Sequence, residues 1–159
     1  IKNKFSCIKS LKFSKSFPDT VKLTFYPRLS FAKLIATPSA EEVSSSHVID
    51  EEGVTIYNTE NNDNIIKIYV SDAEFPLPDI LKILSRVKIF KVDAKEAIIT
   101  ADSLTISGMP KIIFRLGSKL DIQLASLQLI LNEAKIDFSL LEFIDLRFDK
   151  PVVKFAPKK

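Results

Sequence analysis

The sequence predicts an α+β fold in which antiparallel strands, arranged in hairpins and meanders, carry two helices on one side. Two observations support this class. Apolar and polar residues alternate over short stretches along most of the chain, and two longer stretches space their leucines as helices do. The chain has 159 residues, of which 46% are hydrophobic and 27% are charged, so we expect a packed core.

The first predicted element is a β-hairpin. Residues 8–13 alternate between apolar and polar side chains, as a half-buried strand does, and residues 21–25 resume the same alternation. Between them lies Ser16-Phe17-Pro18-Asp19, whose proline and aspartate are typical of turns. We expect this hairpin to end at Pro27.

A second hairpin is predicted after a further strand at residues 29–36. Residues 47–49 and 54–57 are strand-like and flank the turn Asp50-Glu51-Glu52-Gly53. Gly53 can adopt the positive φ that such a turn requires, because it has no Cβ atom.

Polar loops are expected at residues 37–46 and 58–64, and a strand at residues 65–70. The apolar period then changes from that of a strand to that of a helix. Pro78 and Asp79 suit the first turn of this helix. The apolar positions at helical spacing are Leu77, Ile80, Leu81, Leu84 and Val87.

Four short strands are predicted next, at residues 88–92, 97–101, 103–106 and 111–116. Gly117 ends the last of them. No internal sequence repeat is evident along the chain.

A second helix of roughly four turns follows. Ser118, with Asp121 three residues later, is similar to a capping box at its start. One apolar stripe runs along it through Leu120, Leu124, Leu127, Leu131 and Ala134.

Two strands, at residues 141–148 and 152–155, close the chain. The alternation in the first predicts two opposite faces. Ile144, Leu146 and Phe148 are expected on one face, and Asp145, Arg147 and Asp149 on the other.

The sequence argues against catalysis and against a metal or cofactor site. His47 is the only histidine and is expected at the surface, and Cys7 is the only cysteine and is expected as a small buried apolar residue. Neither a P-loop nor a dinucleotide-binding glycine motif is present. The net charge of +3 is too small, and the lysines too evenly spread, for nucleic-acid binding.

The C-terminus predicts a binding edge instead. Pro151 has no N–H for a strand ladder, so the last strand is expected at the edge of the sheet. Val152, Val153 and Phe155 follow it as an apolar tail. An edge with unpaired backbone groups and exposed apolar side chains can recruit a strand from another protein.

Four stretches of the chain match one family in order. Phe143-Ile144-Asp145-Leu146-Arg147-Phe148-Asp149, placed after the second helix and continued by Val152-Val153-Lys154-Phe155-Ala156-Pro157, resembles the end of the bacterial cell-division proteins of the FtsQ/DivIB family. Residues 112–117 and 47–53 also fit that family, and residues 17–21 resemble the hairpin of a POTRA domain.

This resemblance implies that residues 1–27 are the C-terminal portion of a POTRA-like module and that residues 28–159 form an FtsQ/DivIB-like β domain. It implies a non-enzymatic scaffold of the division septum, held in the cell membrane by one helix, with this portion outside the cytoplasm. The implied partners are small single-span coiled-coil division proteins, FtsB/DivIC and FtsL, bound by strand addition so that septal wall synthesis is recruited. The implied contact residues are Phe148, Val152, Val153 and Phe155.

Two other hypotheses stay open. The chain could be an envelope POTRA/β interaction module of a different assembly or secretion system, or an enzyme whose carboxylates converge only in space. No stretch approaches the roughly 20 apolar residues of a membrane span. Because Ile1 is not an initiator methionine, we expect that the N-terminus is trimmed, which leaves room upstream for the anchor that the resemblance implies.

Overall fold

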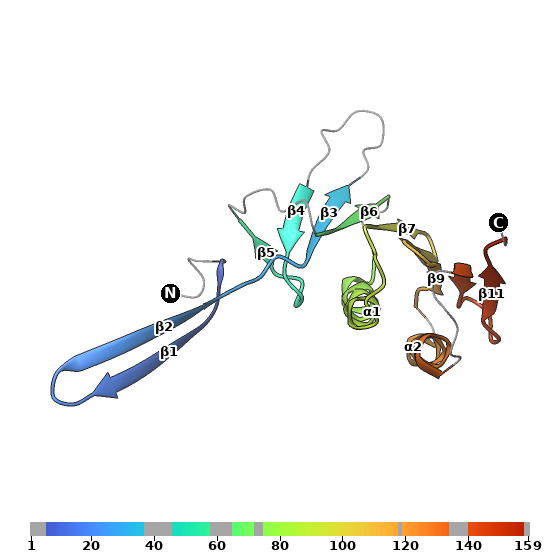
Figure 1. Ribbon diagram of the computed structural model, residues 1–159. Helices are drawn as coiled ribbons and strands as arrows, with labels where there is room; N and C mark the ends of the chain where they lie inside the picture. The colour runs from blue at the N-terminus through green and yellow to red at the C-terminus, as the bar shows by residue number, and fades with distance from the viewer. Residues whose placement is uncertain are drawn as a thin grey trace.

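The computed structural model describes residues 6–36, 46–57, 65–71, 75–117, 119–133 and 140–157. Nearly all of the two predicted polar loops lies outside these ranges. The described residues confirm an α+β fold in which strands predominate. An elongated main sheet carries its helices on one face, and a long hairpin projects from one end of it (Figure 1).

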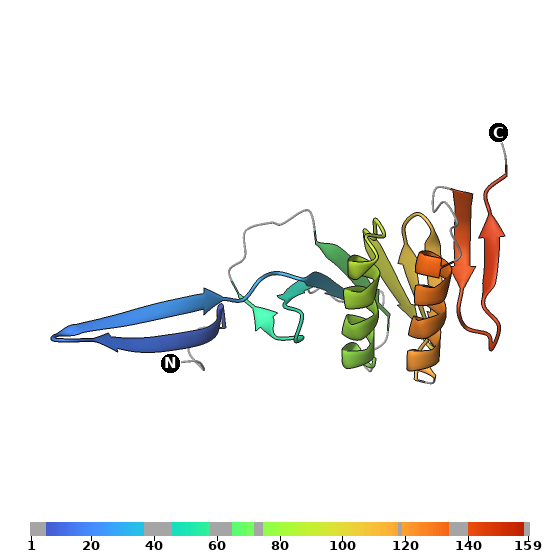
Figure 2. The ribbon, with the colours of Figure 1, turned by 60° about the horizontal axis from the view of Figure 1, so that its bottom comes forward.

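The projecting hairpin, called the arm below, consists of β1 (Ile8–Ser16) and β2 (Thr20–Pro27). The two strands pair antiparallel with each other, as predicted, and form a sheet of their own (Figure 2). The half-buried face that the alternation predicts is not covered within the described residues. Its side chains are exposed: Phe13, Val21, Leu23 and Phe25.

Within the described ranges, the main sheet has nine strands in the order β11-β10-β9-β8-β7-β6-β3-β4-β5. Their bounds are β3 Ala32–Ala36, β4 Ser46–Ile49, β5 Thr55–Ile56, β6 Ile66–Val70, β7 Glu96–Thr100, β8 Ser103–Ser107, β9 Lys111–Arg115, β10 Leu141–Asp145 and β11 Val152–Phe155.

The prediction of an antiparallel domain holds for only part of the main sheet, which is mixed. Strand β6 lies parallel to both β3 and β7, and β9 lies parallel to β10. The helices explain two of these pairs, since a parallel pair needs a long crossover connection. Helix α1 connects β6 to β7, and α2 connects β9 to β10.

The topology contains a repeat that the sequence does not reveal. A strand, a helix, a parallel strand and an antiparallel strand follow one another in β6-α1-β7-β8 and again in β9-α2-β10-β11. The second unit therefore ends in β11 as the first ends in β8. Strand β8 is covered on its far side by β9, whereas β11 is the last strand of the order.

Helix α1 (Leu77–Ile89) begins after Pro76 and has Pro78 in its first turn, as predicted. The predicted stripe is confirmed, since Ile80, Leu81, Leu84 and Val87 are buried and Leu77 is half-buried. The predicted strand at residues 88–92 is wrong: the helix continues through Ile89, and Lys91 at φ 56° turns the chain toward β7. A short run of apolar and basic residues fits both the helical and the strand period, so the sequence pattern alone did not distinguish a helix from a strand here.

Helix α2 (Leu120–Gln128) continues as a π-helical turn, η2 (Leu129–Glu133). Leu124, Leu127 and Leu131 are buried as predicted, whereas Ala134 and Ser118 lie outside the described residues. The residue before the helix, Lys119 at φ 52°, makes no side-chain cap.

Buried Gln123 ties the start of α2 to the end of β9. Its Oε1 atom accepts the N–H of Arg115 at 2.8 Å, and its Nε2 atom donates to the Arg115 carbonyl at 3.0 Å. The side-chain amide thus satisfies both backbone groups of Arg115, which fixes the helix against the sheet.

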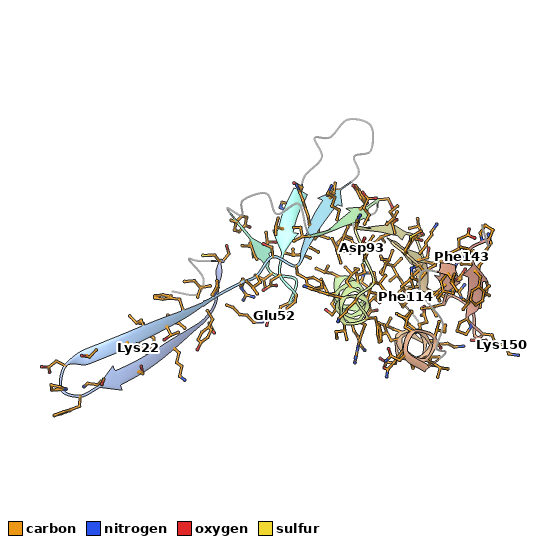
Figure 3. All side chains as sticks on the ribbon, viewed as in Figure 1. Lys22, Glu52, Asp93, Phe114, Phe143 and Lys150 are labelled. Atoms are coloured by element: carbon orange, nitrogen blue, oxygen red, sulfur yellow. The ribbon has the colours of Figure 1, made fainter. Side chains whose placement is uncertain are left out.

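The core lies between the helices and one face of the main sheet. Phe114, labelled in Figure 3, is fully buried on β9. Other fully buried side chains from this strand and from further strands of the sheet share that face: Ile68, Ala97, Leu104, Ile106, Ile112 and Ile144.

Candidate functional site

The C-terminal strand β11 is the edge of the main sheet. It pairs antiparallel with β10, and among the described residues no other strand lies beside it (Figure 1). Figure 2 shows β11 beyond both helices, at the end of the molecule opposite the arm. The edge expected from Pro151 and the apolar tail is therefore present in the fold.

One hydrogen bond sets which backbone groups of β11 point outward. The N–H of Ala156 donates to the carbonyl of Leu140 at 2.8 Å. Because backbone groups alternate sides along a strand, the N–H and C=O groups of Lys154 and Val152 also point toward β10. The N–H and C=O groups of Val153 and Phe155 therefore point away from the sheet, toward solvent.

A β-bulge lies opposite this part of β11. Phe155 is paired with Leu141, whereas Lys154 is already paired with Phe143, so Glu142 is the extra residue. The bulge is on β10, and it leaves the alternation of β11 unbroken. β-Bulges are common near sheet edges, where they bend the strand that contains the extra residue.

The side chains of β11 divide between the core and the surface. Val153 is half-buried and packs against the core, while Val152 and Phe155 are 47% and 53% exposed. The strand thus presents an outward backbone at Val153 and Phe155 together with accessible apolar side chains.

Phe148 does not lie where the alternation predicts. Ile144 and Leu146 are buried, as expected for one face, but Phe148 is 58% exposed. The reason is that β10 ends at Asp145, so Phe148 belongs to the bend that leads to β11. The structure therefore brings Val152, Val153 and Phe155 together on one strand and leaves Phe148 in the bend before it.

Asp145 and Arg147 end β10, a role that the sequence reasoning missed. Both were expected on the outward face, yet Asp145 is only 5% exposed. Its carboxylate accepts the backbone N–H of Arg147 at 3.1 Å, which closes a turn of the chain. The Arg147 guanidinium donates to the same carboxylate from Nε at 3.0 Å and from Nη2 at 2.7 Å.

This contact holds the pKa of Asp145 below its ordinary value, although burial acts in the opposite direction. An aspartate with an arginine two residues later at a strand end is the signal that could have indicated this turn.

The bend is also fixed on its outer side. The Arg147 guanidinium lies 5.7 Å from the centroid of the Phe148 ring, within the range of a cation–π contact. Lys119, at the start of α2, forms an ion pair with Asp149 at 2.6 Å. The bend is therefore tied to the second helix, and the Phe148 ring is held at the surface next to the edge strand.

The opposite edge of the main sheet differs. Strand β5 has only two residues, Thr55 and Ile56, and the arm emerges at that end (Figure 1). The N–H of Tyr57 is bonded to the Ser6 hydroxyl at 3.4 Å. A short edge is one way in which proteins block unwanted strand pairing, so β11 is the better docking edge.

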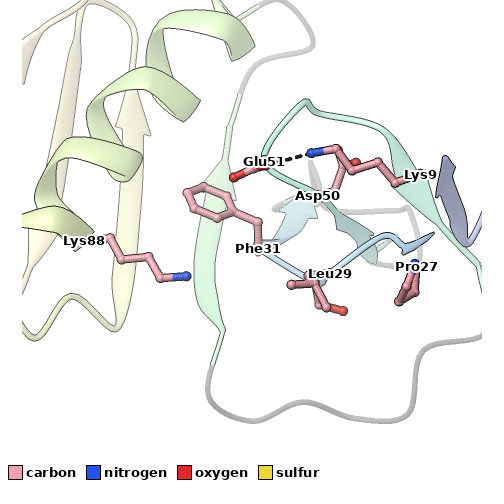
Figure 4. A pocket seen from close by; sticks show the side chains of 8 residues that line it. Lys9, Pro27, Leu29, Phe31, Asp50, Glu51 and Lys88 are labelled. Atoms are coloured by element: carbon pink, nitrogen blue, oxygen red, sulfur yellow. Dashed lines mark hydrogen bonds and ion pairs between the residues drawn. The ribbon is translucent and has the colours of Figure 1, made fainter. Parts of the chain in front are cut away.

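A hollow of about 150 Å³ lies where the arm meets the main sheet (Figure 4). Phe31, Leu29 and Lys88 line it, and the Lys9–Glu51 ion pair, at 2.9 Å, crosses its rim. Its buried carboxylate, Asp50, is already bonded to Arg28 and to the N–H groups of Glu52 and Val54. The hollow shows no nucleophile with a base beside it.

Other residues considered from the sequence gather no site. His47 is exposed, as expected, whereas Cys7, which precedes β1, is exposed and not buried. Among the described residues, no three histidine, cysteine, aspartate or glutamate side chains are grouped to hold a metal ion. In the same residues, no helix combines the length and apolarity needed to span a membrane.

Comparison with known proteins adds no assignment. No family model matches the sequence, and no curated protein is significantly similar to it.

Proposed function

We propose that this protein is a scaffold that binds an extended segment of a partner by strand addition to β11. The observation that carries the proposal is the outward backbone of Val153 and Phe155 on the last strand of the main sheet. Strand addition needs an edge with free N–H and C=O groups for affinity and side-chain contacts for specificity. Val152, Phe155 and the neighbouring Phe148 offer those contacts.

The energies are consistent with a specific complex. Val153 and Phe155 offer two donors and two acceptors, and each hydrogen bond contributes a net of about 0.5–1.5 kcal/mol. Burial of one large apolar side chain contributes about 1.5–3 kcal/mol when it is fully exposed beforehand. Since Phe155 is half-exposed, roughly half of that is available. Association costs offset much of this sum, so Phe148 and Val152 would matter as well.

The partner class comes from the resemblance to the FtsQ/DivIB family. On that basis the added strand belongs to a small single-span coiled-coil division protein of the FtsB/DivIC or FtsL kind. The protein then acts outside the cytoplasm at the division septum, attached to the cell membrane by one helix, and recruits septal wall synthesis. No catalytic step is part of this function.

The arm has a place in the same proposal. Its uncovered apolar face, with Phe13, Leu23 and Phe25, is typical of a sheet that packs against something else, since an isolated two-stranded hairpin is at best marginally stable. We assign the arm to the C-terminal end of a POTRA-like module, in which that face is covered.

A binding experiment with matched variants tests the edge. Val153→Pro deletes an outward N–H without removing a bond to β10, whereas Val153→Thr keeps the N–H and the branched shape. In a pull-down with the coiled-coil division proteins of the same organism, we expect Val153→Pro and Phe155→Ala to lose binding and Val153→Thr to retain most of it. Folding of each variant is checked by circular dichroism. Full binding by folded Val153→Pro and Phe155→Ala would reject the proposed edge.

A further inference from the structure

The face of the main sheet opposite the helices carries a row of mostly apolar side chains. Helices α1 and α2 lie on the same side of the sheet, and in the described ranges nothing covers the other side (Figures 1 and 2). The strand register aligns one residue from each of seven neighbouring strands in a row across that face. The row, called the apolar row, comprises Ile35, Tyr69, Ile98, Thr105, Ile113, Asp145 and Val152.

The apolar row is accessible in part. Ile98, near its middle, is 41% exposed, and Tyr69, Thr105 and Ile113 are half-buried. Asp145 is its one charged member, and that carboxylate is paired with Arg147. Neighbouring residues along each strand point to the core, so these side chains have no partner layer within the described residues.

A basic row runs beside the apolar row on the same face, two residues away along each strand. It includes Lys33, Lys67 and Lys111, and the register places Lys33 beside Lys67. None of these three lysines forms an ion pair with a residue that the structure describes. Glu96 lies opposite Lys67, and at the far end of the row Lys154 is paired with Glu142 at 2.8 Å. Among the described residues, the face therefore combines apolar side chains with an excess of positive charge.

We propose that this face binds an acidic amphipathic helix of a partner protein. The face of a sheet offers no free backbone groups, so a partner bound there must satisfy its own backbone hydrogen bonds, as a helix does. An apolar stripe bordered by carboxylates is the complement of an apolar row bordered by lysines. The apolar row reaches β11 only at Val152, and its other members lie on other strands. The inference therefore does not depend on strand addition.

A designed peptide pair provides the probe. One 20-residue amphipathic helix carries leucines on one side and glutamates on the other, and its twin has lysines in place of the glutamates. Fluorescence anisotropy with the purified chain should show saturable binding of the glutamate peptide. The lysine peptide should bind at least about tenfold more weakly at low salt, because like charges then face each other.

Variants then locate the binding surface. We expect Ile98→Thr, which keeps the β-branched shape, to lower the affinity for the glutamate peptide about three- to tenfold. Lys111→Glu should weaken it about tenfold at low salt. The matched controls are Ile122→Thr on the exposed side of α2 and Phe13→Ser on the arm, and both should bind as the wild type does.

The pattern of results decides the proposal. Equal binding of the two peptides, or no saturable binding of either, would overturn it. Loss of binding in Phe13→Ser with no loss in Ile98→Thr would also overturn it, because the arm would then be the apolar surface that the peptide finds. Strand addition could fail its own test with Val153→Pro while these results stand.

Discussion

Replacement of Arg147 by alanine is the sharpest test of how the edge is built. The change removes the guanidinium that donates to both carboxylate oxygens of Asp145 from Nε and Nη2. Asp145 is 5% exposed and would keep the backbone N–H of residue 147 as a donor. A buried acceptor left without its partners costs about 1–3 kcal/mol, and more if it is charged.

We expect a loss of about 2 kcal/mol in the free energy of unfolding at pH 7, because water can reach the site once the partly exposed arginine is gone. For a chain of this length such a loss lowers Tm by roughly 4–8 °C. Urea unfolding followed by circular dichroism measures it. The control is Lys82→Ala, which breaks the exposed ion pair with Asp121 and should change stability much less.

The pH dependence of the same variant gives a second readout. The pKa of Asp145 is lowered in the folded protein, so its contribution is present above the unfolded pKa and is lost as the pH falls through the folded value. The difference between wild type and Arg147→Ala should therefore shrink below about pH 4. If Arg147→Ala is no less stable than Lys82→Ala at pH 7, the buried pair does not hold the end of β10.

Three further predictions concern other parts of the fold. Gly108→Ala should lower the free energy of unfolding by about 2–3 kcal/mol, because the new Cβ atom would lie 2.6 Å from the Asp93 carbonyl oxygen. Gly117→Ala, in open space at φ 77°, should lower it by only about 1 kcal/mol, and equal losses in urea unfolding would contradict this difference. The amides of β1 and β2 should exchange with solvent much faster than those of β7 and β8 in hydrogen-exchange measurements on this chain, because the arm has no covered face within the described residues; equal protection would refute the isolated arm. Burial raises the pKa of Asp50, but the Val54 N–H, the Arg28 side chain and the Glu52 N–H outweigh burial and hold this pKa below its ordinary value. Acid below about pH 4 should therefore loosen the arm from the sheet in the wild type more than in Asp50→Asn, which small-angle scattering can measure. Identical acid responses of the two proteins would contradict a role of Asp50 in holding the arm.

The sequence predicted the local elements better than their partners. The turn at Asp50–Gly53 and the stripe of α1 follow from residue chemistry within a few positions, and both are confirmed. The parallel pairing of β6 with β3 and β7 is not encoded in alternation, because the same alternation serves parallel and antiparallel neighbours.

At the candidate site, too, local features were predicted correctly and features that depend on contacts were not. Pro151 indicated an edge strand from a local property, and β11 is that edge. The expected position of Phe148 is wrong because the alternation was extended past Asp145, where a side-chain contact between two residues ends the strand. Exposure of Phe13 and Phe25 likewise depends on what covers the arm, which no local pattern specifies.

Hydrogen exchange along β11 tests strand addition most directly. In the free protein the amides of Val153 and Phe155 should exchange rapidly, while those of Lys154 and Ala156 should be slow, because only the latter face β10. On addition of the coiled-coil partner, the Val153 and Phe155 amides should become protected. Protection of these two amides in the free chain, or no change on binding, would contradict strand addition at this edge.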